Sequence, residues 1–171
     1  TLRPAELRDA AAILAVQAAS WRHAYEDLLP ERIFPRAGDP GGIGYWQELL
    51  LAGDTATRLA VGADGAVLGF ASGGGRRDHE LPADGELYAI YLMPQLQGQG
   101  VGRRLFHALG AVLEARGARS MGLWALAANI PARGFYRHLG GRLARRRQSR
   151  ERGVLFDEVA YVWEPMERVR G

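Results

Sequence analysis

The sequence predicts one α/β domain over residues 1–171, with antiparallel strands in its first half and a strand–helix–strand crossover after them. An apolar strand pattern at 86–92 leads into the glycine-rich turn 97–102 and then into a long amphipathic helix. Two apolar runs joined by residues 63–65 (Ala-Asp-Gly) are typical of a β-hairpin. Of the 171 residues, 47% are hydrophobic, which is enough to form a core.

The first half of the chain is expected to form helices and antiparallel strands. Apolar residues recur at the spacing of one helix face over 6–25, and Asp9 suits the positive end of that helix. Residues 36–44 are expected to be a loop, because glycine and proline are frequent there. The other elements expected here are strands at 2–5, 58–62 and 66–72, a short helix at 45–51 and an exposed connection at 73–85.

The second half is expected to alternate strands and helices. The helix after the glycine turn ends at 116–117 (Arg-Gly), since glycine commonly follows a helix C-terminus. Asn129 and Pro131 predict the start of a short helix, because asparagine caps helices and proline is favoured in the first turn. Further strands are expected at 120–126, 142–152 and 154–163.

Composition excludes several chemistries. The chain has no cysteine, which excludes disulfides, thiolate metal sites and a cysteine nucleophile. All 22 basic residues are arginine, so a P-loop lysine and a Schiff base are also excluded. No run of about 18 apolar residues and no signal-peptide pattern occurs, so we expect a cytoplasmic protein without a membrane partner. No metal is expected, because the histidines lack ligand spacing.

The glycine turn has the features of an anion site. A strand, a glycine turn and a helix N-terminus direct free N–H groups and the positive end of the helix dipole at one place, which suits a pyrophosphate. A dinucleotide-binding Gly-x-Gly-x-x-Gly motif starting at Gly98 would need glycine at position 103, where the chain has arginine. A Walker loop needs a lysine, which the chain lacks.

The pattern that fits is Gln-x-x-Gly-x-Gly, formed by Gln97, Gly100 and Gly102 after a strand that ends at Pro94. A second block follows in order: Asn129 and Tyr136, seven residues apart, before residues 139–140 (Leu-Gly). With these two blocks the chain resembles the GNAT superfamily of acyl-CoA-dependent N-acetyltransferases over almost its whole length. The family usually has phenylalanine at the position of Gly141, so this chain lacks one core aromatic at a strand start.

The resemblance implies a three-layer α/β (α+β) fold. Its sheet is mixed, mostly antiparallel and six- to seven-stranded, with helices on both sides and splayed central strands four and five. The implied donor is acetyl-CoA and the implied acceptor is an amine-bearing small molecule or peptide; a homodimer is plausible by analogy. The turn should wrap the pyrophosphate, and residues 90–92 should pair with the pantetheine arm. The implied CoA site is Ile90, Tyr91, Leu92, Gln97, Gly98, Gln99, Gly100, Val101, Gly102, Arg103, Asn129 and Tyr136.

Acyl transfer to an amine needs a group that removes a proton. An amine with a pKa of about 10.4 is protonated at pH 7, and deprotonating it costs roughly 4.6 kcal/mol. A carboxylate can act as general base, and Glu86 is the candidate, although it could equally be a polar residue at a strand end. Acidic residues near the mouth, Glu26 among them, weakly favour a cationic amine.

The resemblance assigns two further roles. The Leu92 amide, beside a bulge that splays the strand, should bind the oxyanion. Tyr136 should donate a proton to the leaving thiolate, with a purely structural aromatic as the alternative. Trp21, Tyr25 and Glu26 are expected to line the acceptor pocket, although Trp21 taken alone fits the core better.

The main hypothesis is therefore an acetyl-CoA-dependent N-acetyltransferase that works by direct attack in a ternary complex. Two alternatives stay open. One is a non-catalytic acyl-CoA-binding or interaction module, and the other is a nucleic-acid binder acting through the arginine run at 142–152. A solvated face of exposed strands explains that run better, because no aromatic residues interleave it.

Overall fold

A seven-stranded mixed sheet runs through the computed structural model, which describes residues 1–169 apart from the side chains of residues 167 and 168. The last two residues of the predicted domain lie outside this range. Neighbouring strands are antiparallel except for the parallel pair β4 and β5. In spatial order the strands are β1 (Leu2–Pro4), β2 (Ala56–Val61), β3 (Val67–Gly75), β4 (Gly85–Leu92), β5 (Met121–Leu126), β7 (Val154–Trp163) and β6 (Arg142–Glu151).

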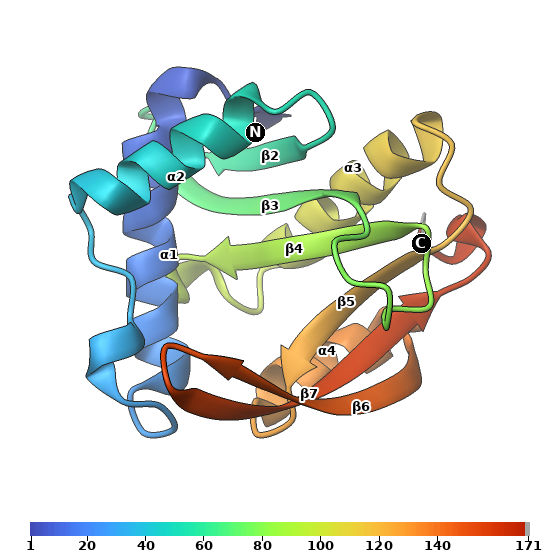
Figure 1. The fold of residues 1–171 in the computed structure, drawn as a ribbon. Coiled ribbons are helices and arrows are strands. Elements are labelled where there is room, and N and C mark those ends of the chain that lie inside the picture. The colour runs from blue at the N-terminus through green and yellow to red at the C-terminus, as the bar shows by residue number, and fades with distance from the viewer. Residues whose placement is uncertain (170–171) are drawn as a thin grey trace.

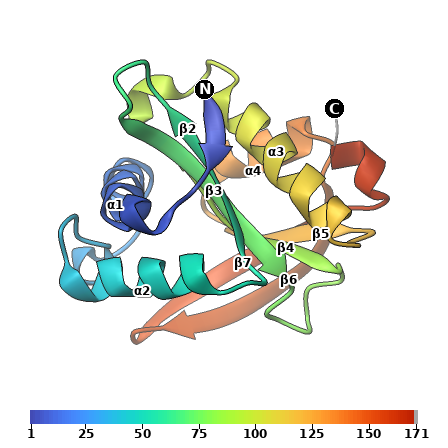
Figure 2. The ribbon, with the colours of Figure 1, turned by 90° about the horizontal axis from the view of Figure 1, so that it is seen from above.

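Helices cover both faces of the sheet, as Figures 1 and 2 show. Helices α1 (Ala10–Tyr25) and α2 (Pro40–Leu51) pack on one face, and α3 (Val101–Ala115) and α4 (Ile130–His138) pack on the other. The short helices are η1 (Leu7–Asp9), η2 (Glu31–Ile33), η3 (Pro94–Leu96) and η4 (Met166–Val169). The predicted three-layer fold is confirmed. None of the helices within residues 1–169 has the length and apolar character needed to span a bilayer.

Two predicted boundaries are wrong. Helix α2 starts inside the expected loop 36–44, because the Oδ2 atom of Asp39 accepts a 2.7 Å hydrogen bond from the Gly42 N–H and Pro40 occupies the first turn. A capping aspartate followed by proline outweighs the glycines that favoured a loop. Strand β3 continues through Gly75, which pairs with Gly85, so the connection to β4 is shorter than expected.

The sheet opens between β4 and β5. These strands pair only at their first residues, Gly85 with Met121 and Glu86 with Gly122. Beyond Glu86 strand β4 continues to Leu92 without a partner in β5, while β5 pairs with β7 along its whole length. The predicted splay of strands four and five is therefore present, and it leaves one edge of β4 unpaired.

The core supplies an aromatic residue opposite Gly141 from another strand. Trp163 of β7 is fully buried, and its Nε1 donates a 2.8 Å hydrogen bond to the Leu139 carbonyl. A Cβ atom on Gly141 would lie 2.6 Å from the Trp163 ring. The indole therefore fills the space beside this strand start, and a side chain at position 141 would have no room.

Strand β6 forms one edge of the sheet and carries most of the arginine run. It pairs with β7 over residues 142–151, and its other edge pairs with no strand of the described chain. Four of its side chains, those of Arg142, Arg145, Arg146 and Arg150, are exposed. For these four residues the prediction of a solvated face is confirmed.

Candidate active site

Six consecutive backbone amides at the glycine turn lack an acceptor among the described residues. Helix α3 begins at Val101, and its first main-chain bond runs from Arg104 N–H to the Gly100 carbonyl at 3.1 Å. The amides of residues 98–103 precede that bond and donate to no acceptor in the described part of the chain. Gly98 and Gly100 have φ angles of 75° and 74°, which glycine adopts without strain. This cradle at the positive end of α3 fits a pyrophosphate.

Main-chain groups of β4 face the opening in the sheet. The Met93 N–H donates to the Leu68 carbonyl at 2.9 Å, which fixes the phase of hydrogen bonding between β4 and β3. Because bonded and non-bonded pairs alternate in an antiparallel ladder, Tyr91 also bonds to β3. Ile90 and Leu92 then turn their N–H and C=O groups toward the unpaired edge. Two of the three residues predicted to meet the pantetheine arm therefore have free main-chain groups, and Tyr91 does not.

The bulge in β4 lies at Tyr88, so its predicted place beside Leu92 is wrong. Ala89 lies opposite Ser72, whereas Leu87 lies opposite the very next residue of β3, which makes Tyr88 the extra residue. A bulge bends its strand and increases the local twist. It therefore accounts for the divergence of β4 from β5 directly after their two paired residues.

Asn129 links helix α4 to helix α1. Its Oδ1 accepts a 3.1 Å hydrogen bond from the Ala132 N–H and caps α4, as predicted. Its Nδ2 donates to the Tyr25 hydroxyl at 3.1 Å. Burial raises the pKa of Tyr25, and the bond from Asn129 partly opposes that shift. Two predicted site residues that are 104 positions apart are therefore in contact.

Tyr136 lies buried in α4 among aromatic side chains. Its ring centroid is 5.9 Å from that of Tyr161 and 6.2 Å from that of Trp163. Burial raises the pKa of Tyr136 well above its usual value, and the nearby Tyr25 adds to the shift. The hydroxyl therefore stays protonated across the physiological pH range and can act as a donor.

The other predicted acceptor residues lie at the end of α1. Trp21 packs edge-on against Tyr25 and Phe34, with ring centroids 5.1 and 6.0 Å apart, in a small hydrophobic cluster. This packing agrees with the core interpretation of Trp21. Glu26 follows the last helical residue and is exposed.

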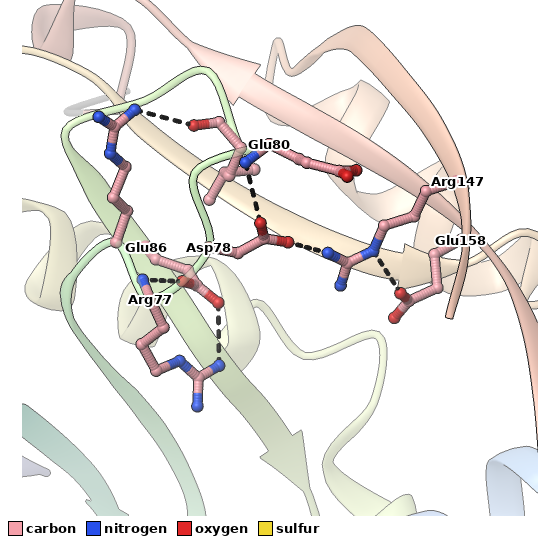
Figure 3. Close-up of polar contacts among 8 residues, drawn as sticks. Arg77, Asp78, Glu80, Glu86, Arg147 and Glu158 are labelled. Atoms are coloured by element: carbon pink, nitrogen blue, oxygen red, sulfur yellow. Dashed lines mark hydrogen bonds and ion pairs between the residues drawn. The ribbon is translucent and has the colours of Figure 1, made fainter. Parts of the chain in front are cut away.

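Glu86 is buried and held by one residue. The Arg77 backbone N–H donates to Glu86 Oε2 at 2.7 Å, and the Arg77 guanidinium donates to Oε1 at 2.9 Å (Figure 3). The same guanidinium lies over the Tyr88 ring, 3.8 Å from its centroid. Both oxygens of the predicted base are therefore engaged by Arg77, a residue that the sequence placed only in an exposed connection.

Strand β4 separates the predicted catalytic groups along its length. Glu86 is its second residue and Leu92 its last. At about 3.3 Å per residue, six residues span roughly 20 Å of a regular strand, less what the bulge takes up. Ile90 is two residues nearer to Glu86 than Leu92 is. The structure therefore does not bring the predicted base and the predicted oxyanion donor together.

A second ion-pair network was not predicted. Arg147 of β6 donates to Glu158 Oε2 at 2.7 Å and also to Asp78, and its guanidinium lies 3.8 Å from the Trp124 ring centroid (Figure 3). Its side chain is only 24% exposed, so the prediction of a solvated face is wrong for this arginine. The charge pattern of β6 could not reveal the contact, because Asp78 is 69 positions away.

The fold and the site together define a class of protein. A cradle of free amides next to an unpaired strand edge, in a sheet that opens at a parallel strand pair, agrees with the acyltransferase site that the family resemblance implies. Among the described residues, no group of three or more histidine, aspartate or glutamate side chains could hold a metal ion.

Comparisons with known proteins give the family. Residues 13–140 match the model of the Acetyltransferase (GNAT) family. The chain is 32% identical to the uncharacterized N-acetyltransferase YuaI of Bacillus subtilis, over 95% of this chain and 92% of the relative. It is 31% identical to the aminoglycoside N(6')-acetyltransferase type 1 of Stenotrophomonas maltophilia, over 82% of this chain and 84% of the relative. The chain belongs to the Acetyltransferase (GNAT) family and is an acetyltransferase by class.

Solved structures share the fold. The yncA structure from Salmonella typhimurium, which contains its cofactor acetyl-CoA, matches with a TM-score of 0.70 and 21% sequence identity. The match covers 96% of this chain and 92% of that chain.

Proposed function

We propose that the chain acts as one N-acetyltransferase domain over residues 1–171 and transfers an acetyl group from acetyl-CoA to a primary amine. The observation that carries this proposal is the run of free amides at 98–103 beside the unpaired edge of β4. The chain contains no cysteine that could form a thioester acyl-enzyme, which favours direct attack of the amine in a ternary complex.

The donor would be bound mostly by main-chain groups. The amides of residues 98–103 hold the pyrophosphate, and Ile90 and Leu92 pair with the pantetheine arm as with an added strand. Side chains support the turn: the Gln99 Nε2 donates to the Gln95 carbonyl at 2.8 Å, and Arg103 donates to His107 at 3.2 Å. The bound molecule supplies the acetyl thioester.

The chemical roles follow from position along β4. We assign the oxyanion to the Ile90 amide instead of Leu92, because Ile90 is the free amide nearer to Glu86. Glu86 accepts the amine proton, the amine nitrogen bonds to the acetyl carbon, and the carbon–sulfur bond breaks. Tyr136 supplies a hydrogen bond or a proton to the departing sulfur. Asn129 holds the start of α4 and with it Tyr136.

A panel of acceptors tests the proposal. Free CoA release from acetyl-CoA is measured with polyamines, amino acids, peptide N-termini and an aminoglycoside, and succinyl-CoA is tested in parallel. At least one amine should release CoA. Binding of CoA without release by any amine would favour the non-catalytic module, and absence of CoA binding would refute the donor site.

Two substitutions test the catalytic roles. Tyr136→Phe and Glu86→Gln should each lower kcat by about 100-fold or more while the Kd for CoA stays near the wild-type value. Tyr161→Phe is the matched control, because it removes a hydroxyl from the neighbouring buried ring. Because the pKa of Tyr136 is raised, its ionisation should add no loss of activity below about pH 10. Unchanged turnover in both variants would remove these assignments.

A further inference from the structure

Arg77 places a cation between a carboxylate and an aromatic face. Its guanidinium donates to Glu86 at 2.9 Å and lies 3.8 Å from the Tyr88 ring centroid. The Tyr88 hydroxyl donates to the Gly75 carbonyl at 2.6 Å, which fixes the ring. A carboxylate binds an organic cation as an ion pair, and an aromatic face binds it through a cation–π contact. Glu86 and Tyr88 therefore form a cation site, and a side chain of the protein itself fills it.

The two oxygens of Glu86 are held in different ways. Oε2 accepts from the backbone N–H of Arg77, a contact that does not depend on the arginine side chain. Oε1 accepts from a single guanidinium nitrogen. If the side chain swings away, the backbone still orients the carboxylate, and Oε1 becomes free to accept from another N–H donor.

Exposure shows which partner can leave. The Arg77 side chain is 50% exposed, whereas that of Glu86 is 6% exposed. The guanidinium can therefore move into water, and the carboxylate cannot follow it. Asp78, the next residue, is paired with Arg147 and keeps the loop backbone in place (Figure 3). An unpaired buried carboxylate is unfavourable, so binding of another cation is favoured when the guanidinium leaves.

We propose that Glu86 and Tyr88 bind the cationic amine of the acceptor, and that the Arg77 side chain occupies this subsite until the acceptor displaces it. The inference rests on the proposed function, since it concerns the acceptor of the same reaction. Arg77 thus acts as an intramolecular competitor that primary alkylammonium groups must displace from this subsite. The base is thus masked by Arg77 until a substrate of matching charge arrives.

A binding experiment tests this without requiring turnover. Calorimetric titrations with n-butylammonium and with methylguanidinium are compared for the wild type, Arg77→Met and Arg77→Met/Glu86→Gln. Arg77→Met keeps the aliphatic stem and the backbone N–H. It should bind both probes about tenfold more tightly than the wild type, the combined size expected of one half-exposed ion pair and one cation–π contact. The double variant should lose this gain.

Further variants test the Tyr88 ring separately and distinguish the subsite from a general effect of charge. Arg76→Met removes a charge from the same loop but leaves Glu86 untouched, because the Arg76 guanidinium donates to the Leu81 carbonyl. This variant should bind the probes as the wild type does. In the Arg77→Met background, Tyr88→Phe should keep the gain and Tyr88→Leu should weaken binding by several-fold. Melting temperatures of all variants identify any that fails to fold.

The kinetic arm uses whichever amine releases CoA in the acceptor panel. Arg77→Met should lower the KM for that amine and leave the KM for acetyl-CoA unchanged. If no amine releases CoA, the proposed function fails, yet the titrations still decide whether the subsite exists. Probe binding by folded Arg77→Met no tighter than by the wild type, or an equal gain in Arg76→Met, would overturn the inference.

Discussion

Replacing Gly100 by alanine separates backbone strain from loss of space at the phosphate cradle. Gly100 precedes α3 with a φ of 74°, and no heavy atom lies within 4 Å of the position that a Cβ would take. Alanine therefore fits sterically but must adopt the left-handed conformation, at a cost of about 1–2 kcal/mol. Gly65, in the turn between β2 and β3, has a φ of 84° and equally open surroundings, which makes Gly65→Ala the matched control.

The strain can appear in two measurements. If the alanine in Gly100→Ala kept the glycine conformation, the free energy of unfolding would fall by about 1–2 kcal/mol and the Tm by roughly 2–8 °C. If the turn relaxes instead, CoA must restore it on binding, and the Kd rises by up to about 5- to 30-fold. The loss in stability and the loss in binding free energy should therefore add up to the strain. Gly65→Ala should lose stability alone.

Urea denaturation gives the unfolding free energies, and calorimetric titration with CoA gives the Kd values for the wild type and both variants. Two results would refute the reasoning. One is Gly100→Ala with wild-type stability and wild-type CoA affinity, which would mean that the residue is not held in the left-handed conformation. The other is equal weakening of CoA binding in both variants, which would mean that the cradle is not the binding site.

Two further predictions concern contacts that hold the frame of the site. Arg3 donates to both oxygens of Asp9, at 2.7 and 2.8 Å, and this bond lowers the pKa of the Asp9 carboxyl. The carboxylate therefore stabilises the fold above its unfolded pKa of about 3.9, and this stability is lost as pH falls through the lower folded pKa. Asp9→Asn should cost about 1–3 kcal/mol at pH 7 in urea denaturation, and the cost should shrink as pH falls below the unfolded pKa; a cost that does not change with pH would contradict this. Asn129→Ala should destabilise the protein by about 1 kcal/mol more than Asn129→Ser, since serine keeps the cap. Asn129→Ser should cost less in a Tyr25→Phe background, where the hydrogen bond from Asn129 to the Tyr25 hydroxyl is already absent. Equal costs in both backgrounds would exclude that hydrogen bond.

The elements that sequence reasoning predicted well carry local signals. The turn at Asp64-Gly65 joins β2 and β3, and Asn129 caps α4, because turn and cap chemistry depends on a few neighbouring residues. The glycine turn was located for the same reason. A local signal was also present and missed at Asp39-Pro40, where glycine content hid the start of α2.

The remaining features depend on contacts between distant segments. The bulge at Tyr88 follows from the register of β4 against β3, which no single segment encodes. Arg77 reaches Glu86 because the connection between β3 and β4, which contains Arg77, folds back on the sheet. Arg147 of β6 pairs with Asp78 of the same connection, 69 positions away. Periodicity assigned these arginines to exposed segments. It could not show that carboxylates from other segments would pair with them.

The arginines of β6 also bear on how copies of this protein meet. A long unpaired edge strand is a template on which another chain can add a strand. Two β6 edges brought side by side would set the exposed guanidinium groups of residues 142, 145, 146 and 150 against one another, and like charges opposite each other on paired strands are destabilising. Charge repulsion between these arginines therefore disfavours edge-to-edge pairing of two copies along β6.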